Sequence, residues 1–245
     1  MFLRVRLFSV MVLLGLLSGT NTVKAGYDVL NTYTALHGGL DGIELGTQTI
    51  GLSYSADETT VVLKNDLSYK FGPLAVYEFK QEVTELYQKE RLIRLSSQTQ
   101  ISDYRCGKGD GSYVNGEDFY LNGKAGRGNE APFSINVIAK KGESFLSKET
   151  GDQGERPMAI LTASLWNDQI LSREQLLDTI DGQMMNVAVT EVGPESVKAK
   201  GKDVKTIHYK ISGDIDSDLW FHSKGILMQY RLTGCDGKDI YYVLR

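Results

Sequence analysis

Hydrophobic and polar residues alternate along most of the chain beyond residue 40, and turn-forming residues interrupt the alternation. A period of two places successive side chains on opposite faces of an extended segment, which is typical of half-buried antiparallel strands. In the first part of the chain the pattern predicts strands over residues 43–54, 60–71, 73–87, 91–103 and 133–139. Pro73 suits the first position of its strand, because the missing N–H is not needed there. Alternate residues of that strand, including Gln81, Glu85 and Tyr87, are expected to share one face.

The middle of the chain departs from this alternation. Residues 106–116 are rich in glycine and polar side chains, and Asn122-Gly123 is a tight-turn signal. Residues 140–157 are charged and contain glycine, so they predict a long exposed loop. Ser172 can cap one short helix near residues 173–180, which must pack on the sheet because a helix of two turns is marginal alone.

The final third of the chain alternates most regularly. It predicts a meander of strands over residues 184–192, 196–200, 202–213, 218–222, 226–232 and 240–244, with a turn at Gly193-Pro194. Within residues 202–213 one face should point inward and the other outward; the inward set is Ile207, Tyr209 and Ile211, and the outward set is Thr206, His208 and Lys210.

Neither an internal repeat nor a linker divides the chain, so residues 26–245 are expected to form a single β-rich domain. Antiparallel meanders curl or close to protect their edge strands. The predicted fold is therefore mainly β: a curved antiparallel sheet, or half-open β-barrel, with one short helix packed on it.

The first twenty-five residues have the pattern of a signal peptide. Arg4 and Arg6 precede an apolar stretch over residues 7–17, and Ala25 is the small residue expected before a cleavage site. Gly26 follows instead of a cysteine, so no lipid attachment is expected there. The apolar stretch is too short to span a bilayer comfortably. The sequence thus predicts a signal peptide over residues 1–25 and a periplasmic or secreted protein without a transmembrane anchor after cleavage.

Charge narrows the range of partners. The chain has a net charge of −4, and the leader holds three basic residues and no acidic one, so the mature protein carries about −7. Basic residues occur in pairs such as Lys140-Lys141 but form no larger cluster. A surface of this kind binds nucleic acid and anionic membranes poorly, so neither is an expected partner.

The chain contains two cysteines, Cys106 and Cys235. Each follows a predicted strand and lies beside a glycine-containing turn, so the two can reach each other. In an oxidising compartment a disulfide between them is expected, and two separate thiols are the alternative.

Few residues suggest catalysis or metal binding. His37, His208 and His222 lie on separate segments, and the chain has neither a GxSxG motif nor a phosphate-binding loop. No catalytic residue, metal or cofactor is therefore predicted. Glu85 comes nearest to a catalytic candidate, because burial on an inward face would raise the pKa of its carboxyl, as acid–base catalysis requires. An arginine partner or a solvated sheet edge would explain the same residue.

Aromatic and methionine side chains suggest ligand binding more strongly. The mature chain contains Trp166, Trp220 and many tyrosines, and Met184, Met185 and Met228 add adaptable apolar surface. On a curved sheet these side chains could line a cavity for an acyl chain or another apolar ligand. An ordinary core filled by the same side chains is the alternative, and it is the more common use of such residues.

Short motifs carry a family resemblance over residues 41–245. They are Asp41-Gly42-x-x-Leu45-Gly46, Glu85-Leu86-Tyr87, Ser164-Leu165-Trp166-Asn167, Asp218-Leu219-Trp220-Phe221 and Asp236-Gly237. With these motifs the chain resembles a bacterial family of exported proteins of unknown function. That family is similar in strand pattern to the lipoprotein-localisation carriers of the LolA/LolB type. The resemblance implies an unclosed antiparallel barrel whose concavity holds acyl chains, although those carriers plug it with several helices and only one is predicted here.

These observations favour a non-enzymatic binding protein that holds an apolar or lipidic ligand in the concavity of its sheet. Trp166 and Trp220 are the predicted cavity residues, with Tyr87 and Glu85 near the mouth. One alternative is an envelope scaffold that binds a protein partner through strand edges or residues 140–157, without a pocket above about 300 Å³. A less favoured alternative is a hydrolase of an envelope polymer that uses Glu85.

Overall fold

The computed structural model of the protein describes residues 26–71, 74–89, 91–101, 119–124, 133–139, 146–151, 154–180, 182–234 and 236–245. Side chains are described over residues 26–70, 77–89, 91–100, 160–180, 182–234 and 236–245. Cys106, Cys235 and the leader lie outside the described residues, so the disulfide and the signal peptide stay predictions.

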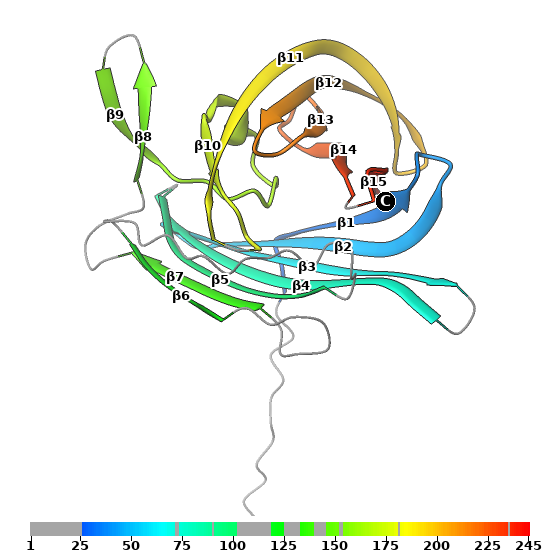
Figure 1. The fold of residues 1–245 in the computed structure, drawn as a ribbon. Coiled ribbons are helices and arrows are strands. Elements are labelled where there is room, and N and C mark those ends of the chain that lie inside the picture. Colours follow the sequence, from blue (N-terminus) through cyan, green and yellow to red (C-terminus); the bar gives the residue numbers. More distant parts are fainter. Residues whose placement is uncertain are drawn as a thin grey trace, which may run out of the picture.

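Thirteen strands form one antiparallel sheet in the order β10-β11-β12-β13-β14-β15-β1-β2-β3-β4-β5-β7-β6. Their bounds are β1 Val29–His37, β2 Ile43–Tyr54, β3 Glu58–Phe71, β4 Leu74–Gln88, β5 Arg91–Ile101, β6 Phe119–Lys124, β7 Phe133–Ala139, β10 Gln175–Leu177, β11 Met184–Ala199, β12 Lys202–Gly213, β13 Ser217–Phe221, β14 Leu227–Thr233 and β15 Asp239–Leu244. Strands β8 (Leu146–Gly151) and β9 (Gly154–Ala159) form a separate hairpin. Because β10 and β6 are the two edges, the sheet stays open (Figure 1). The predicted mainly β fold with a curved, unclosed antiparallel sheet is confirmed.

Strand β1 was not predicted, and it joins the two halves of the sheet. It pairs with β2 on one side and with the last strand, β15, on the other. Tyr33 lies opposite both Gln48 and Leu244 in these two pairings. The first and last strands are therefore neighbours, and the sheet continues without a break from the C-terminal meander into β2–β5.

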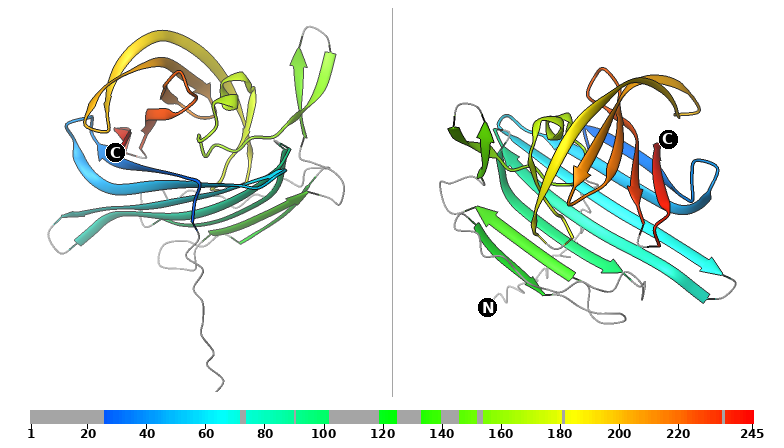
Figure 2. Two further views of the ribbon diagram at one scale, coloured as in Figure 1. Left: turned by 180° about the vertical axis from the view of Figure 1, so that it is seen from behind. Right: turned by 45° about the horizontal axis from the view of Figure 1, so that its top comes forward.

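The C-terminal half of the sheet curls strongly. Strand β11 arches over β12–β15, and the arch is visible from both sides (Figures 1 and 2). Lys200 N donates to Leu244 O at 2.8 Å, which brings the β11–β12 turn to the end of β15. The predicted turn at Gly193-Pro194 is wrong: both residues lie within the continuous strand β11, where the pairing shifts between Glu191 and Gly193. Gly193 takes a φ of +129°, which suits a bulge that bends a long strand.

The predicted helix over residues 173–180 is also wrong. A 3₁₀ helix, η1, spans Asp168–Ser172, and Asn167 caps it by accepting from Gln169 N at 2.9 Å. Residues 175–177 instead form the edge strand β10, where Leu176 pairs with Met185. Both leucines of β10 are buried, so pairing and burial outweigh the local helix signal.

Other local predictions need correction. The expected loop at 140–157 contains most of the β8–β9 hairpin, and Asn122-Gly123 lies inside β6, with Asn122 opposite Asn136. Thr206 was expected to point outward but is buried, and its hydroxyl donates to Glu195 O at 2.8 Å. The curl of the β11–β12 hairpin covers that face.

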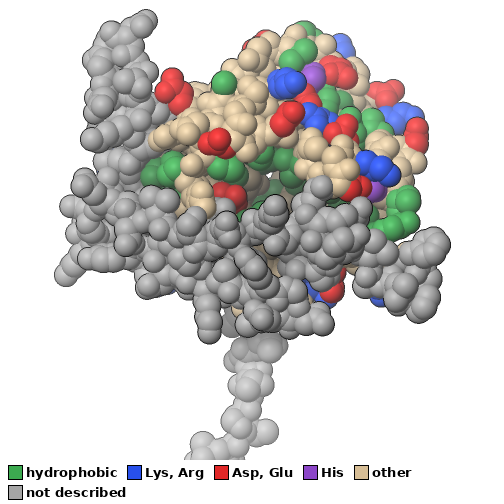
Figure 3. Space-filling view, viewed as in Figure 1, with side chains coloured by type: hydrophobic (Ala, Val, Ile, Leu, Met, Phe, Trp, Pro, Cys, Tyr) green, Lys and Arg blue, Asp and Glu red, His purple; other side chains and the backbone are tan. Residues whose placement is uncertain are grey.

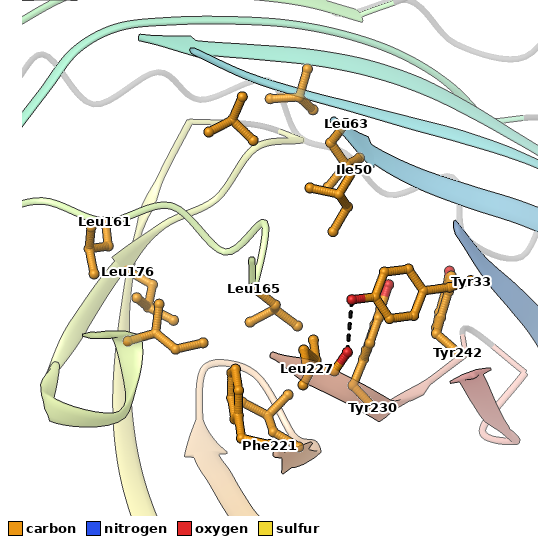
Figure 4. Packing of buried hydrophobic residues seen from close by; sticks show 14 of the residues in the cluster. Tyr33, Ile50, Leu63, Leu161, Leu165, Leu176, Phe221, Leu227, Tyr230 and Tyr242 are labelled. Carbon is orange, nitrogen blue, oxygen red and sulfur yellow. Dashed lines mark hydrogen bonds between the residues drawn. The ribbon is translucent and has the colours of Figure 1, made fainter. Parts of the chain in front are cut away.

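The core fills the space between β1–β5 and the curled half of the sheet. Leu165 lies between Ile50 and Leu63 of the flat half and Leu227 of the curled half (Figure 4). Tyr33 donates its hydroxyl to Leu227 O at 2.9 Å, which ties the halves together. Full burial of a leucine or isoleucine side chain such as these contributes about 1.5–3 kcal/mol to stability. Within the described ranges no helix is long and apolar enough to cross a membrane.

Candidate ligand-binding cavity

A cavity of about 580 Å³ lies inside the curl of the sheet. Strands β2–β4 form its floor, β14 and β15 form the opposite wall, and parts of residues 160–180 close one side. Most of its lining is apolar; the apolar set is Ile43, Leu45, Leu63, Tyr69, Tyr77, Phe79, Ala163, Leu165, Ile180, Met185, Ile215, Tyr230, Leu232, Ile240 and Tyr242. Hydrophobic side chains line a hollow beneath the arch of β11 (Figure 3). A concave, mainly apolar space of this size is typical of a small-molecule binding site.

A row of amide side chains crosses the cavity floor. Gln48 of β2, Asn65 of β3 and Gln81 of β4 are direct neighbours in the sheet register and point to the same face. Gln48 Nε2 donates to Asn65 Oδ1 at 3.1 Å, and Asn65 Nδ2 donates to Gln81 Oε1 at 3.1 Å. Gln81 Nε2 donates to both the carbonyl oxygen and Oγ1 of Thr179, each at 3.3 Å. We call these three side chains the amide ladder.

Two stacked tyrosines lie next to the Gln48 end of the ladder. The rings of Tyr230 and Tyr242 lie 4.3 Å apart and nearly parallel, at 4°. Burial raises the pKa of Tyr230 well above its usual value, the neighbouring Tyr242 and Tyr33 add to the rise, and a hydrogen bond from Gln48 acts in the opposite direction. Burial also raises the pKa of Tyr242. Both phenols are therefore neutral at physiological pH.

Charged groups gather at an exposed end of the cavity, which we call the mouth. His37 Nε2 and Asp236 Oδ2 lie 2.8 Å apart, joining the end of β1 to the turn before β15. Lys238 and Ile43 line the same end and are exposed. The cavity thus runs from the amide ladder, beside the packed core, to a polar mouth.

Glu85 forms a buried cluster with two of the other predicted site residues. Its Oε2 accepts from Tyr87 at 2.9 Å and from Trp166 Nε1 at 3.0 Å, and its Oε1 accepts from Thr162 at 2.7 Å. Burial raises the pKa of the Glu85 carboxyl, and hydrogen bonds from Thr162, Ser164, Trp166 and Tyr87 offset part of the rise. This cluster fastens the segment around residues 162–166 to strand β4.

Trp220 lies apart from that cluster, on the other face of the curled sheet. Its indole stacks on His208 at 4.5 Å and donates to Glu195 Oε2 at 2.8 Å. Asp218 Oδ1 lies 2.7 Å from His208 Nε2, and Asp218 Oδ2 accepts from Arg231 Nε at 2.5 Å. Burial alone would raise the pKa of Asp218, but the hydrogen bonds from His208 and Arg231 outweigh it and lower the pKa. His222, the third histidine, lies in an exposed turn and accepts from Lys224 N.

The structure brings Glu85, Tyr87 and Trp166 together and leaves Trp220 elsewhere, and none of the four is among the described cavity-lining residues. Their role in ligand binding stays a prediction. Sequence reasoning missed the amide ladder, although Gln81 was correctly placed on the inward face of its strand. The available signal was a glutamine between Phe79 and Val83 on that face. Among the described side chains, no three His, Cys, Asp or Glu residues are placed to hold a metal ion.

Fold and cavity define the protein as a barrel-like β protein with an internal, mainly apolar chamber. It belongs to the family known as Domain of unknown function (DUF6134), whose sequence profile matches residues 39–245. Comparison with curated proteins finds no match. Among solved structures it is similar to a β-barrel-like protein of the domain of unknown function DUF1849 from Brucella abortus. The TM-score is 0.50 at 10% identity, over 88% of this chain and 94% of the other. This likeness shows the fold.

Proposed function

We propose that the protein is an exported, non-enzymatic binding protein that holds an apolar or lipidic ligand in the cavity of its curled sheet. The cavity itself carries the proposal. It measures about 580 Å³ and is bounded by aromatic and aliphatic side chains with a few placed polar groups. That combination is the usual composition of a site for a small apolar molecule.

The signal-peptide pattern over residues 1–25 supports a periplasmic or secreted location. The sequence motifs predict a family whose strand pattern resembles that of the lipoprotein-localisation carriers, and this expected resemblance implies an acyl chain or a similar apolar ligand. A scaffold without a pocket above about 300 Å³ is less well supported, because the cavity is larger. A hydrolase that uses Glu85 is also less well supported, because side chains of the protein, among them Thr162, Tyr87 and Trp166, already donate hydrogen bonds to its carboxyl.

Binding of diphenylhexatriene, a neutral apolar dye that fluoresces in apolar surroundings, tests the proposal. The wild-type protein should bind it saturably at one site. Ala163→Phe places a ring in the cavity and should weaken binding at least tenfold. Val192→Phe adds the same ring at an exposed position and is the matched control, which should bind like the wild type.

Lipid extraction of the protein purified from its own compartment gives an independent measurement. A stoichiometric apolar compound that is absent from Ala163→Phe would support the proposal. The proposal is wrong if the wild-type protein neither binds the dye saturably nor carries such a compound.

A further inference from the structure

We infer that the ligand is a single apolar chain bearing a neutral hydrogen-bond donor, a hydroxyl or an amide N–H, and that Gln48 Oε1 accepts from this donor. The inference rests on the proposed function and names the chemical class of its ligand. It follows from the direction of the amide ladder, from the unpaired oxygen at its end and from the charges that line the cavity.

Thr179 fixes the direction of the ladder. Its carbonyl oxygen can only accept, so Gln81 must present its nitrogen to it and its oxygen to Asn65. Asn65 must then donate to that oxygen, which turns its own oxygen toward Gln48. Gln48 in turn donates with its nitrogen to Asn65. Reversing the amides would set the Gln81 oxygen against the Thr179 carbonyl, so only one direction satisfies the row.

This direction leaves one acceptor open at the far end of the ladder. Gln48 is only 5% exposed, so water has little access to its side chain. Its Oε1 is buried and has no hydrogen-bond partner among the described residues. A buried amide oxygen without a partner costs about as much as a lost hydrogen bond, and native proteins rarely keep one without a reason. Because Gln48 lines the cavity, a ligand can supply the missing donor.

The position of Gln48 within the cavity orients such a ligand. The lining residues of β2 run from Gln48 through Leu45 to the exposed Ile43 at the mouth. Beyond Gln48 on the other side lies Ile50, which belongs to the packed core. The donor therefore sits at the inner end beside the ladder, and the apolar chain extends toward the mouth.

The charges exclude a carboxylate as the inner group. Lys238 is the one lysine or arginine among the described lining residues, and it lies at the mouth. The lining carboxylates are Asp178, Asp214 and Asp236, so the cavity has a net negative charge. An anion beside Gln48 Oε1 would meet an acceptor and no cation, and burial would add a large desolvation penalty.

Three probes with the same hydrocarbon chain separate the effect of a hydrogen-bond donor from the effect of charge. Dodecanol is neutral and has a donor, and dodecyl methyl ether is neutral and has none. Dodecanoate is an anion without a donor at neutral pH. Each is titrated against protein loaded with diphenylhexatriene. The wild-type protein should bind dodecanol about tenfold more tightly than the ether, which is the ratio that one additional hydrogen bond to a buried acceptor gives. Dodecanoate should bind most weakly.

Gln48→Met keeps the length of the side chain and removes the acceptor, so it should bring dodecanol to the affinity of the ether and leave the ether unchanged. Leu232→Met is the matched control, since it alters the apolar lining and should change both affinities by the same factor. The inference is overturned if dodecanoate binds as tightly as dodecanol, or if the preference for dodecanol survives in Gln48→Met.

The ranking of the three probes by affinity is measured on the wild-type protein. It therefore tests the inferred neutral donor even if Gln48→Met does not fold. Failure of the proposed function is a separate result: diphenylhexatriene itself, which has no polar group, would then not bind.

Discussion

Replacing Glu85 by methionine should destabilise the protein by about 2–4 kcal/mol, because it removes the acceptor that fastens residues 162–166 to β4. Thr162, Tyr87 and Trp166 all direct a donor at this carboxyl, at 2.7, 2.9 and 3.0 Å. Methionine has nearly the same length and volume, so it leaves no large cavity behind. The loss of stability then measures the hydrogen bonds rather than the packing.

The magnitude follows from which donors can find another partner. Thr162 and Ser164 have hydroxyl oxygens 2.6 Å apart, and the Tyr87 hydroxyl lies 3.4 Å from Thr162 Oγ1, so the hydroxyls can pair with one another. The indole N–H of Trp166 can turn to the Tyr87 hydroxyl oxygen, with which it already makes a hydrogen bond. Without the carboxyl the three hydroxyls and the indole donate only to one another, so the proton at the end of this chain is left without an acceptor. Such an unpaired donor costs about 1–3 kcal/mol, and the weaker bonds of the rearranged groups add about 1 kcal/mol.

Glu85→Gln is the matched control and should cost less than about 1 kcal/mol. The amide oxygen can accept from both Tyr87 and Trp166, while the amide nitrogen donates to Thr162, whose own proton turns to Ser164. A neutral carboxyl uses the same arrangement, which agrees with the raised pKa of Glu85. Urea unfolding followed by far-ultraviolet circular dichroism at neutral pH gives the free energies of unfolding of all three proteins.

Two results would refute this reasoning. If Glu85→Met unfolds within about 0.5 kcal/mol of the wild type, the hydrogen bonds do not hold the segment. If Glu85→Gln is as unstable as Glu85→Met, the site requires a charged carboxylate and the neutral arrangement is wrong. The pH dependence gives a further check, because a raised native pKa means that the folded protein keeps a proton which the unfolded chain releases. The stability advantage of the wild type over Glu85→Gln should therefore shrink as the pH rises above about 4.3, the ordinary pKa of glutamate.

Three further changes have expected outcomes. Gly46→Ala should lower the free energy of unfolding by about 2–4 kcal/mol in urea, because Gly46 has a φ of +144° and a Cβ there would overlap the carbonyl oxygen of Asp66. Gly193→Ala is the control: Gly193 also has a positive φ but has open space around it, so its loss of stability should be about 1 kcal/mol. Tyr33→Phe should lower the free energy of unfolding by about 1 kcal/mol by removing a hydrogen bond between the halves of the sheet. The pKa of Asp218 is lowered in the folded state, so the melting temperature of the wild type should fall relative to that of Asp218→Asn as the pH falls below about 4. If the melting temperatures of both proteins change equally with pH, this prediction is wrong.

Alternation in the sequence was sufficient to predict most of the sheet, because each strand buries one face and solvates the other. Strands β2, β7 and β12 have the predicted bounds, residues 43–54, 133–139 and 202–213. The short helix was misplaced because residues 175–177 have a helical local pattern but gain more by pairing with β11. The bulge at Gly193 was taken for a turn because glycine next to proline is typical of both.

The Glu85 cluster shows what alternation can and cannot predict about a site. Glu85 and Tyr87 were expected on one inward face, and the structure places both there, joined by a hydrogen bond. The third member, Trp166, is 81 positions away from Glu85 in the sequence. No local pattern indicates that its segment packs against β4, so the grouping depends on tertiary structure.

The amide ladder depends on register, which a single sequence specifies poorly. Next to the hairpin Phe71 lies opposite Leu74, and a bulge between Tyr69 and Lys70 then shifts the pairing by one residue. Without that bulge Asn65 would lie opposite Lys80, which would take the place of Gln81 on the cavity face, and the row of amides would not form. A slip of one residue reverses the face of every side chain of a strand, so an irregularity near the end of one hairpin determines which side chains of β4 reach the cavity floor. The chemistry we propose for the ligand therefore rests on a feature of pairing that the hydrophobic pattern does not contain, and a deletion that removes the bulge should abolish the preference for dodecanol along with the ladder.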